Sequence, residues 1–266
     1  MLRKLLKYEI QATAKIFMPM YALLIVFALL NKFFIAVNAD YLRVPQVISA
    51  TVFGVIIIGI CVMTLVVTIQ RYNKNLLSDE GYLSFTLPVK IHSHIDCKML
   101  VSLMWAVLSV LVSLASVFVL AVNDKTILSL QQFFAACMDI LNKVGPGAYM
   151  ILLESLLLVV AGVLCQVLTI YASITVGNMS SKHKILLSIG AYLGFGVIEQ
   201  IVTSILLTSF GGNFTRYFSW LNTAANSDQV LAVQYLLLVL LVYMLVFGVA
   251  YYFLTNWMLK KKLNLE

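Results

Sequence analysis

The stretch VISATVFGVIIIGICVMTLVVTI, residues 47–69, contains no charged side chain and leads, after Gln70, into the polar segment RYNKNLLSDEGYLSFTLPVKIHSHIDCK, residues 71–98. A helix crosses the bilayer core, which is about 30 Å thick, with about 20 apolar residues. Residues 47–69 are therefore predicted to span a membrane. Since another apolar run follows residue 98, we expect the polar segment to be a loop on one face of the bilayer.

The composition extends this interpretation to the whole chain. Of its residues 62% are hydrophobic and 11% are charged, with a mean hydropathy of +0.99, which excludes a water-soluble domain with an ordinary surface. We expect an all-α membrane protein with a single transmembrane domain covering residues 1–266. The six predicted spans are residues 16–37, 47–69, 99–122, 149–176, 185–208 and 230–253. The four cysteines are scattered, so no disulfide framework is predicted.

Three further segments are expected to lie at the membrane surface. Residues 1–15 place apolar side chains near one helical face and basic ones toward the other, the pattern of a short interfacial helix leading into the first span. Pro19 is then expected in the first turn of that span, where no backbone donor is lost. Residues 123–147 indicate an amphipathic helix on the outer surface, ended by the sequence GPG. Aromatic residues between 209 and 228 predict an aromatic belt or a pair of short re-entrant helices.

The basic residues are unevenly distributed along the chain. Most of the 18 lysines and arginines lie in the N-terminal segment, in residues 71–98, in the link between the fourth and fifth spans, and in the C-terminal tail. Basic residues are enriched on the cytoplasmic side of membrane proteins. Both termini and the polar segment are therefore predicted to be cytoplasmic, and the net charge of +7 indicates orientation and not nucleic-acid binding.

The middle of the polar segment, residues 75–88, is too apolar for a freely solvated loop. It combines the acidic pair Asp79 and Glu80 with a set of large apolar side chains. These are Leu76, Leu77, Tyr82, Leu83, Phe85 and Leu87. Residue types alone leave two interpretations open: these side chains rest on lipid headgroups, as in interfacial segments, or they dock into a soluble partner subunit.

The sequence lacks the common motifs for catalysis and nucleotide binding. It contains no GxxxxGK[ST] phosphate loop, so we do not expect this chain to bind ATP by that route. It also contains no HExxH motif and no nucleophile and base at matching depth in the spans, so no catalytic residue, metal or directly bound cofactor is predicted. His92, His94 and Asp96 could form part of a metal site, but interfacial histidines are more often solvated.

Two carboxylates lie inside predicted spans, Glu154 and Glu199. A charge at the centre of the bilayer costs about 2.5 to 3.5 kcal/mol on insertion scales, so such groups face a cavity or a partner. Either they line a substrate path or subunit seam, or they are hydrogen-bonded to polar neighbours. The candidate neighbours are Ser155, Gln200 and Thr203. In the same span as Glu199, Gly190 and Gly194 form a GxxxG spacing that allows close helix packing.

The order of these features resembles the permease subunits of bacterial ABC transporters of the six-span export type. The shared features are an amphipathic N-terminal helix, two spans, a cytoplasmic loop reading SDEGYLSFTLPVK at residues 78–90, Lys98 at the start of the third span, and an aromatic outer hairpin before the sixth. The resemblance covers the whole chain in topology. Its most specific part is DEGYLSFTLP, residues 79–88, which is similar to the corresponding loop of many such permeases from Gram-positive bacteria.

The resemblance implies that the loop is a coupling helix that docks into a groove on a separate ATP-binding subunit. The contact residues that it implies are Asp79, Glu80, Gly81, Tyr82, Leu83 and Phe85. Pro88 would end this element, because proline removes a backbone donor and disfavours a helical Leu87. Two copies of the ATP-binding subunit would hold ATP and Mg, and a second permease copy or paralogue would complete the transporter.

On this basis we expect a permease subunit of an ATP-driven exporter, with several spans in a bacterial cytoplasmic membrane. It would move an amphipathic substrate, such as a peptide, an antibiotic or a lipid, outward. The expected partners are the ATP-binding subunits, the second permease and the lipid bilayer, but no nucleic acid. An alternative from a different class stays open: a polytopic membrane protein that does not transport, such as an assembly, sensor or immunity subunit.

Overall fold

A computed structural model describes residues 2–37, 42–77, 91–122, 124–180, 182–223 and 226–261. Within these ranges all regular elements are helical, and six helices are long and apolar enough to cross a membrane. This confirms the predicted all-α architecture with six candidate spans. The chain divides into two compact units, Met1–Gln132 and Phe133–Glu266.

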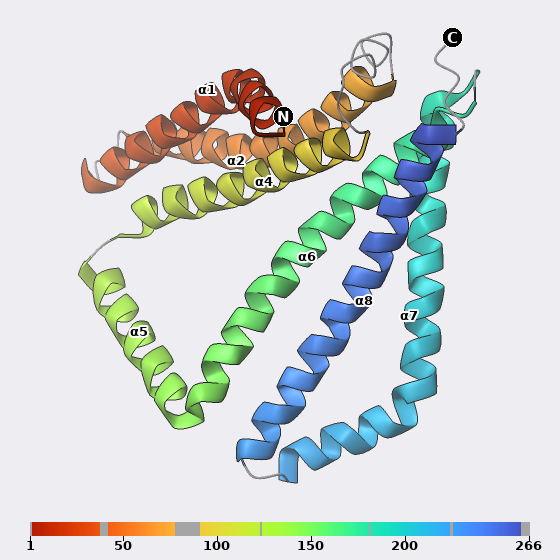
Figure 1. Cartoon of the computed structure of the whole chain (residues 1–266). Coiled ribbons are helices and arrows are strands. Elements are labelled where there is room, and N and C mark those ends of the chain that lie inside the picture. Colours follow the sequence, from red (N-terminus) through yellow and green to blue (C-terminus); the bar gives the residue numbers. More distant parts are fainter. Residues whose placement is uncertain are drawn as a thin grey trace. The chain divides into compact units, whose positions relative to one another are not determined.

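The elements follow one another along the chain as shown in Figure 1. They are α1 (Leu2–Val37), α2 (Arg43–Tyr72), the π-helical turn η2 (Asn73–Leu77), α4 (Ile91–Ala121), α5 (Asp124–Val144), α6 (Pro146–Gly177), α7 (Lys184–Thr223) and α8 (Asn226–Lys261).

Helices α2 and α4 extend further than the predicted spans. Residues 71–77 and 91–98 were predicted to belong to the polar loop, but they are helical, so the connection between the two helices is only residues 78–90. At 1.5 Å per residue the 30 residues of α2 make a helix about 45 Å long, which exceeds the bilayer core. The extensions bury Tyr72, Leu76 and Ile95 completely, and this packing explains why they remain helical.

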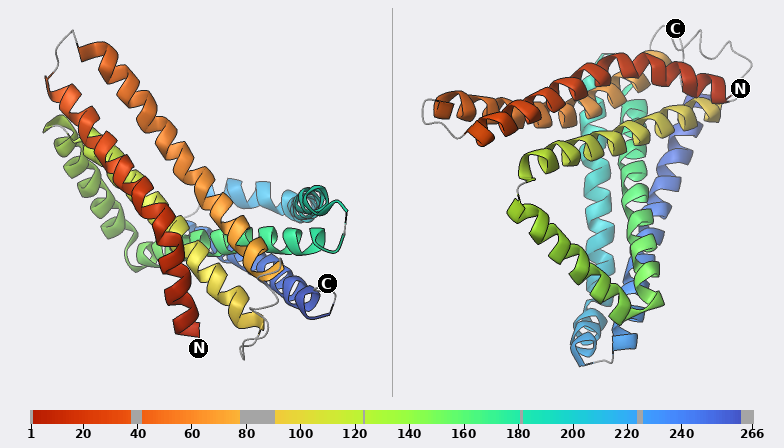
Figure 2. Two further views of the ribbon diagram at one scale, coloured as in Figure 1. Left: turned by 90° about the horizontal axis from the view of Figure 1, so that it is seen from above. Right: turned by 90° about the vertical axis from the view of Figure 1, so that its left-hand side faces the viewer.

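Helix α1 is continuous from Leu2 to Val37, so the predicted interfacial segment and the first span are one element. Pro19 therefore lies in the helix interior and not in a first turn, which corrects the prediction. A proline there removes one backbone hydrogen bond and bends the helix. The N-terminal part of α1 turns away from the axis of the rest in Figure 2.

In the first unit α1 packs against both α2 and α4, and α2 also contacts α4. The core includes Phe17, Leu24 and Ile60, each at most 1% exposed. Phe17 stacks on Trp105 of α4 with ring centroids 4.5 Å apart. The indole nitrogen of Trp105 donates a hydrogen bond of 2.7 Å to the Thr13 hydroxyl. The three helices therefore interlock through specific contacts as well as through apolar burial.

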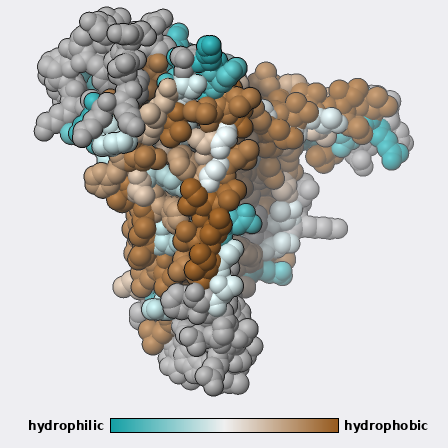
Figure 3. Space-filling model, turned by 90° about the vertical axis from the view of Figure 1, so that its right-hand side faces the viewer, coloured by the Kyte–Doolittle hydropathy of each residue, from teal (hydrophilic) through white to brown (hydrophobic). Residues whose placement is uncertain are grey.

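In the second unit α6 packs against both α7 and α8. The core is built mainly from α6, with Tyr171 and Ala172 at most 1% exposed, whereas the spanning part of α7, Lys184–Leu206, contributes no buried residue. On the side of the molecule shown in Figure 3, most residues drawn in colour on the long helices are hydrophobic. Such a surface suits contact with lipid.

The segments outside the predicted spans are also helical in this half of the chain. Helix α5 ends at Val144 and α6 begins at Pro146, with Gly145 between them at a φ of 71°. The prediction that GPG ends the amphipathic helix is thus confirmed. Helix α7 continues to Thr223 and turns sharply before its end (Figure 1), so the aromatic segment begins as an extension of α7 and not as separate helices.

Candidate functional site

The predicted coupling loop lies outside the described residues. This applies to all of its predicted contact residues, namely Asp79, Glu80, Gly81, Tyr82, Leu83 and Phe85. Its two anchor points are described, because η2 ends at Leu77 and α4 begins at Ile91. Leu76 and Leu77, which the sequence placed on the loop's apolar surface, are instead buried in the first unit, at 0% and 7% exposure.

A buried ion pair joins α1 and α4 in the first unit close to this loop. Lys98 on α4 donates a hydrogen bond of 3.2 Å from its Nζ atom to Oε1 of Glu9 on α1, and the two side chains are only 7% and 14% exposed. The sequence placed Lys98 at the start of a span but gave no sign of this partner. The pair ties the N-terminal part of α1 to the helix that receives the loop.

Hydroxyl groups continue this polar contact along the first unit. The Tyr21 hydroxyl lies 2.7 Å from the Ser109 hydroxyl of α4, which lies 3.1 Å from that of Thr64 on α2. Each of the three helices thus contributes one member to a single chain of hydrogen bonds. Hydrogen bonds between polar side chains of neighbouring helices add specificity inside a membrane protein.

Glu199 lies in the second unit, in the part of α7 that is apolar enough to span a membrane. The Tyr251 hydroxyl of α8 donates a hydrogen bond of 2.7 Å to Oε1 of its carboxylate. Thr203, which was a candidate partner of the carboxylate, instead donates to the Glu199 backbone carbonyl at 2.7 Å. The carboxylate is therefore held by a different helix and not by its own sequence neighbours.

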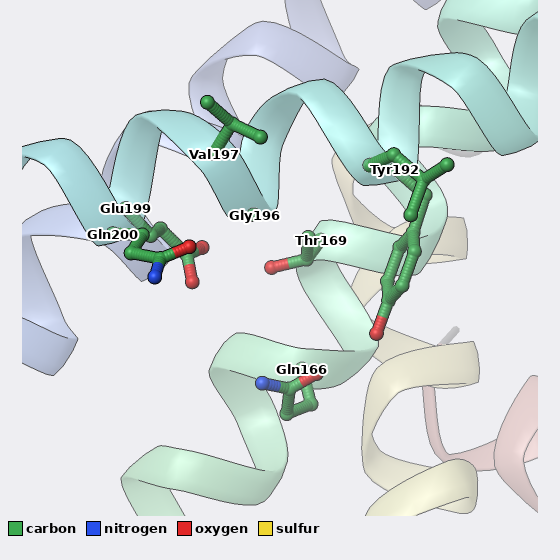
Figure 4. Close-up of a pocket in the computed structure, with 8 residues that line it drawn as sticks. Gln166, Thr169, Tyr192, Gly196, Val197, Glu199 and Gln200 are labelled. Atoms are coloured by element: carbon green, nitrogen blue, oxygen red, sulfur yellow. The ribbon is translucent and has the colours of Figure 1, made fainter.

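The Glu199 carboxylate faces a groove between α6 and α7 with a volume of about 370 Å³. The residues that line it are Gln166, Thr169, Tyr192, Leu193, Gly196, Val197, Glu199 and Gln200. In Figure 4 the Thr169 hydroxyl and the Gln166 amide point from α6 into the same space as the carboxylate. Gly196 opens this space further, since a Cβ atom there would meet nothing within 4 Å.

Aromatic rings of α7 and α8 pack against one another beside Glu199. Phe195 lies against Tyr251, with ring centroids 5.1 Å apart, and Tyr243 lies against Phe247 at 4.9 Å. The Tyr243 hydroxyl also approaches the Glu199 carbonyl oxygen at 3.3 Å. The groove itself combines one carboxylate, neutral polar groups and one aromatic ring, that of Tyr192, which together suit a positively charged organic group.

Sequence reasoning did not single out the tyrosines and the polar groups on α6 that complete this arrangement. Tyr243, Phe247 and Tyr251 are spaced four residues apart in an otherwise aliphatic run, which places them along one face of α8. That periodic aromatic pattern was the available signal. For Gln166 and Thr169 the signal was weaker, because isolated polar residues in a span also bond to their own helix, as Thr169 does to the Cys165 carbonyl at 2.9 Å.

Glu154 lies on α6, away from the groove residues. Its Oε2 atom is buried and has no hydrogen-bond partner among the residues that the structure describes. Its neighbour Ser155 donates instead to the Leu152 carbonyl at 2.8 Å. One carboxylate oxygen of Glu154 is thus buried without the local partner that the sequence suggested.

Gly190 and Gly194 lie on the exposed side of α7. A Cβ atom at either position would meet nothing within 4 Å, so among the residues that the structure describes no helix packs closely against the GxxxG spacing. The role of these glycines in helix packing stays a prediction. Among the described residues there is also no group of three potential metal ligands. On a helix His92 and His94 point to different sides, because successive residues are about 100° apart.

Comparison of the chain with models of protein families, with curated proteins and with solved structures finds no match.

Proposed function

We propose that this chain is the transmembrane permease subunit of an ATP-driven ABC exporter, in which residues 78–90 couple it to a separate ATP-binding subunit. The observation that carries the proposal is the way in which the ends of this loop are anchored. Its first anchor, Leu77, is buried, and its second leads within eight residues to the buried Lys98–Glu9 pair. A loop whose two ends are anchored in this way can transmit a force to the helices, whereas a freely hinged loop cannot.

The mechanism follows from the anchoring of the two loop ends. ATP binding closes the dimer of ATP-binding subunits, and the apolar side chains of the docked loop move with it. Because α1, α2 and α4 are interlocked by the Glu9–Lys98 pair and the Tyr21–Ser109–Thr64 hydroxyls, the three helices move together as one body. The two ends of the membrane path then open alternately, as in other rigid-body transitions. The state of ATP must favour one of the two conformations for this coupling to work.

In this proposal α5 and the N-terminal part of α1 lie at the two surfaces of the membrane. Helix α5 exposes Phe133, Phe134 and Met138, each more than half accessible in the isolated chain, and its apolar side would rest on the outer face of the bilayer. The basic N-terminal part of α1 would lie at the cytoplasmic interface. Both termini and the coupling loop are then cytoplasmic, in the membrane of a bacterial cell, in agreement with the positive-inside pattern.

The proposal is tested by purifying the tagged full-length chain from its native membrane and by changing its loop. We expect a protein with a P-loop ATPase motif to copurify. Tyr82→Ala and Phe85→Ala should lower transport and substrate-stimulated ATP hydrolysis without reducing membrane insertion, because the lost side chains would be docking anchors. Ser84→Ala in the same loop is the matched control and should behave like the wild type.

Two results would contradict the proposal. One is the purification of the intact chain without any ATPase, which would favour a polytopic protein that does not transport. The other is full coupling in both Tyr82→Ala and Phe85→Ala, which would remove the loop from the mechanism.

A further inference from the structure

We propose that the groove between α6 and α7 binds an organic cation, an ammonium or guanidinium group on an amphipathic molecule, with Glu199 as its counter-ion. The inference rests on the proposed function, since it assigns a chemical class to the molecule that moves along the membrane path. It is carried by the geometry around Glu199.

The Glu199 carboxylate has no basic partner among the residues that the structure describes. A carboxylate in a spanning helix is costly and is normally paired or placed in a cavity. In the described part of the chain no basic side chain forms an ion pair with it, and the Tyr251 hydroxyl supplies a single hydrogen bond to Oε1. A carboxylate has two oxygens with about four acceptor positions. Acceptor capacity thus remains for a positively charged donor.

The size and lining of the groove suit a small amphipathic molecule. Its volume of about 370 Å³ lies at the lower end of the range for small-molecule sites, about 300 to 1,000 Å³. The Thr169 hydroxyl faces the carboxylate across the groove, and its oxygen can accept a hydrogen bond from an N–H group of an ammonium. Gln166 lines the same groove and adds a neutral amide to it. Leu193 and Val197 give the same groove an apolar wall, which suits the hydrocarbon part of an amphipathic molecule.

The lining of the groove suits an organic cation better than a metal ion. Hard divalent cations prefer several oxygen ligands, often from more than one carboxylate, whereas Glu199 is the one carboxylate that lines the groove. Tyr192 lines the groove, and Phe195 and Tyr251 form a ring pair beside the carboxylate. Ring faces attract ammonium and guanidinium groups, and the attraction is stronger where water is excluded.

The depth of the site favours an amphipathic molecule other than a bilayer lipid. Tyr243 and Tyr251, which contact Glu199, lie in the interior of the spanning segment Val230–Lys260 and not at its ends. Headgroups of bilayer lipids lie at the level of the helix ends. An amine on a transported molecule can reach the groove, while a lipid in its normal position cannot.

The test measures the binding of dodecylamine, which is an ammonium at neutral pH, to the full-length chain in phosphatidylcholine nanodiscs. Glu199→Gln keeps an acceptor for Tyr251 but removes the charge, and we expect it to weaken binding at least about tenfold. Gly196→Leu should weaken binding similarly, because the new side chain would occupy the groove without touching the charge. Dodecanol, a neutral molecule of equal chain length, should not distinguish Glu199→Gln from the wild type, because it carries no charge for the carboxylate to bind.

Two control variants make the result specific. Glu154→Gln removes the other carboxylate in a spanning helix, and Gly59→Leu adds the same side chain at an open position of α2 in the first unit. Both should bind dodecylamine like the wild type. Unchanged binding in Glu199→Gln and Gly196→Leu would overturn the proposal, as would an equal loss in Glu154→Gln, which would indicate a general effect of charge.

A second arm identifies the source of the cation. If nanodiscs of phosphatidylethanolamine abolish the difference between wild type and Glu199→Gln, the site binds a lipid headgroup and the assignment to a transported molecule fails. If the difference persists, the assignment holds. Neither result depends on the ATP-binding subunit, so copurification of an ATPase still tests the proposed function independently.

Discussion

The Glu9–Lys98 pair shows how charged side chains contribute to the first unit at the scale of single residues. Both side chains are largely buried, so each has lost most of its hydration and relies on the other. Within the same unit Thr13 and Trp105 form a neutral hydrogen bond of 2.7 Å. These contacts fix α1 against α4 at defined positions, whereas apolar side chains alone allow sliding.

Removing one member of the pair should destabilise the protein strongly. We expect Glu9→Gln or Lys98→Met to lower the free energy of unfolding by about 3 to 5 kcal/mol, because each leaves an uncompensated buried charge. Thermal unfolding of the purified chain in detergent measures the effect. The double variant should be more stable than the sum of the two single losses predicts, since it leaves no unpaired charge.

The exposed residue Lys182 provides the matched control, and Lys182→Met should leave the unfolding temperature almost unchanged. Additive losses in the double variant would show that Glu9 and Lys98 do not interact.

At the scale of the elements, α1 is the helix whose shape matters most for the first unit. Thr13 and Phe17, which precede Pro19, contact Trp105, while Tyr21, which follows it, reaches Ser109 further along α4. The bend in α1 allows both parts of the helix to follow α4. We expect a straighter helix to weaken one of the two contacts.

We therefore expect Pro19→Ala to change the environment of Trp105, because it restores the missing backbone hydrogen bond and favours a straighter helix. The measurement is the fluorescence emission of Trp105 in a chain that carries Trp220→Phe and Trp257→Phe. Pro45→Ala, near the beginning of α2, is the control and should leave the emission unchanged. An identical emission in Pro19→Ala and the parent chain would show that the bend does not position Trp105.

The same elements show how far sequence reasoning reaches. The number and type of the spans follow from hydropathy, because each apolar run exceeds the length that a bilayer requires. The helical extensions at 71–77 and 91–98 do not follow, since their polar residues hide the side chains that become buried, such as Tyr72 and Ile95. Hydropathy averages over a segment, and burial depends on which face of the helix meets a neighbour.

The candidate site shows the same limit. Glu199 was recognisable as a charge inside an apolar run, but its partner Tyr251 lies 52 residues further along the chain. The tertiary arrangement of α7 and α8 decides that pairing, and a single sequence does not encode it in a readable pattern. The aromatic spacing on α8 indicated a shared face, and only the structure showed what that face contacts.

At the scale of the whole molecule, the chain is a helical protein with six candidate spans in two units. The first unit carries the ends of the loop at 78–90, and the second carries the groove at Glu199. We propose that the first receives the force from ATP and that the second contacts the transported molecule. Docking of the loop at 78–90 on the ATP-binding subunit is the central claim of the proposed function.

The most direct test places a photo-crosslinking amino acid at Tyr82 of the full-length chain in living cells. The account predicts a crosslinked product with a soluble protein that carries a P-loop ATPase motif, because Tyr82 would lie in the docking groove of that subunit. The same amino acid at Phe134 on α5, which is proposed to face the outer surface, is the control and should not give this product. A chain that is inserted normally but gives no ATPase adduct at Tyr82 would contradict the account.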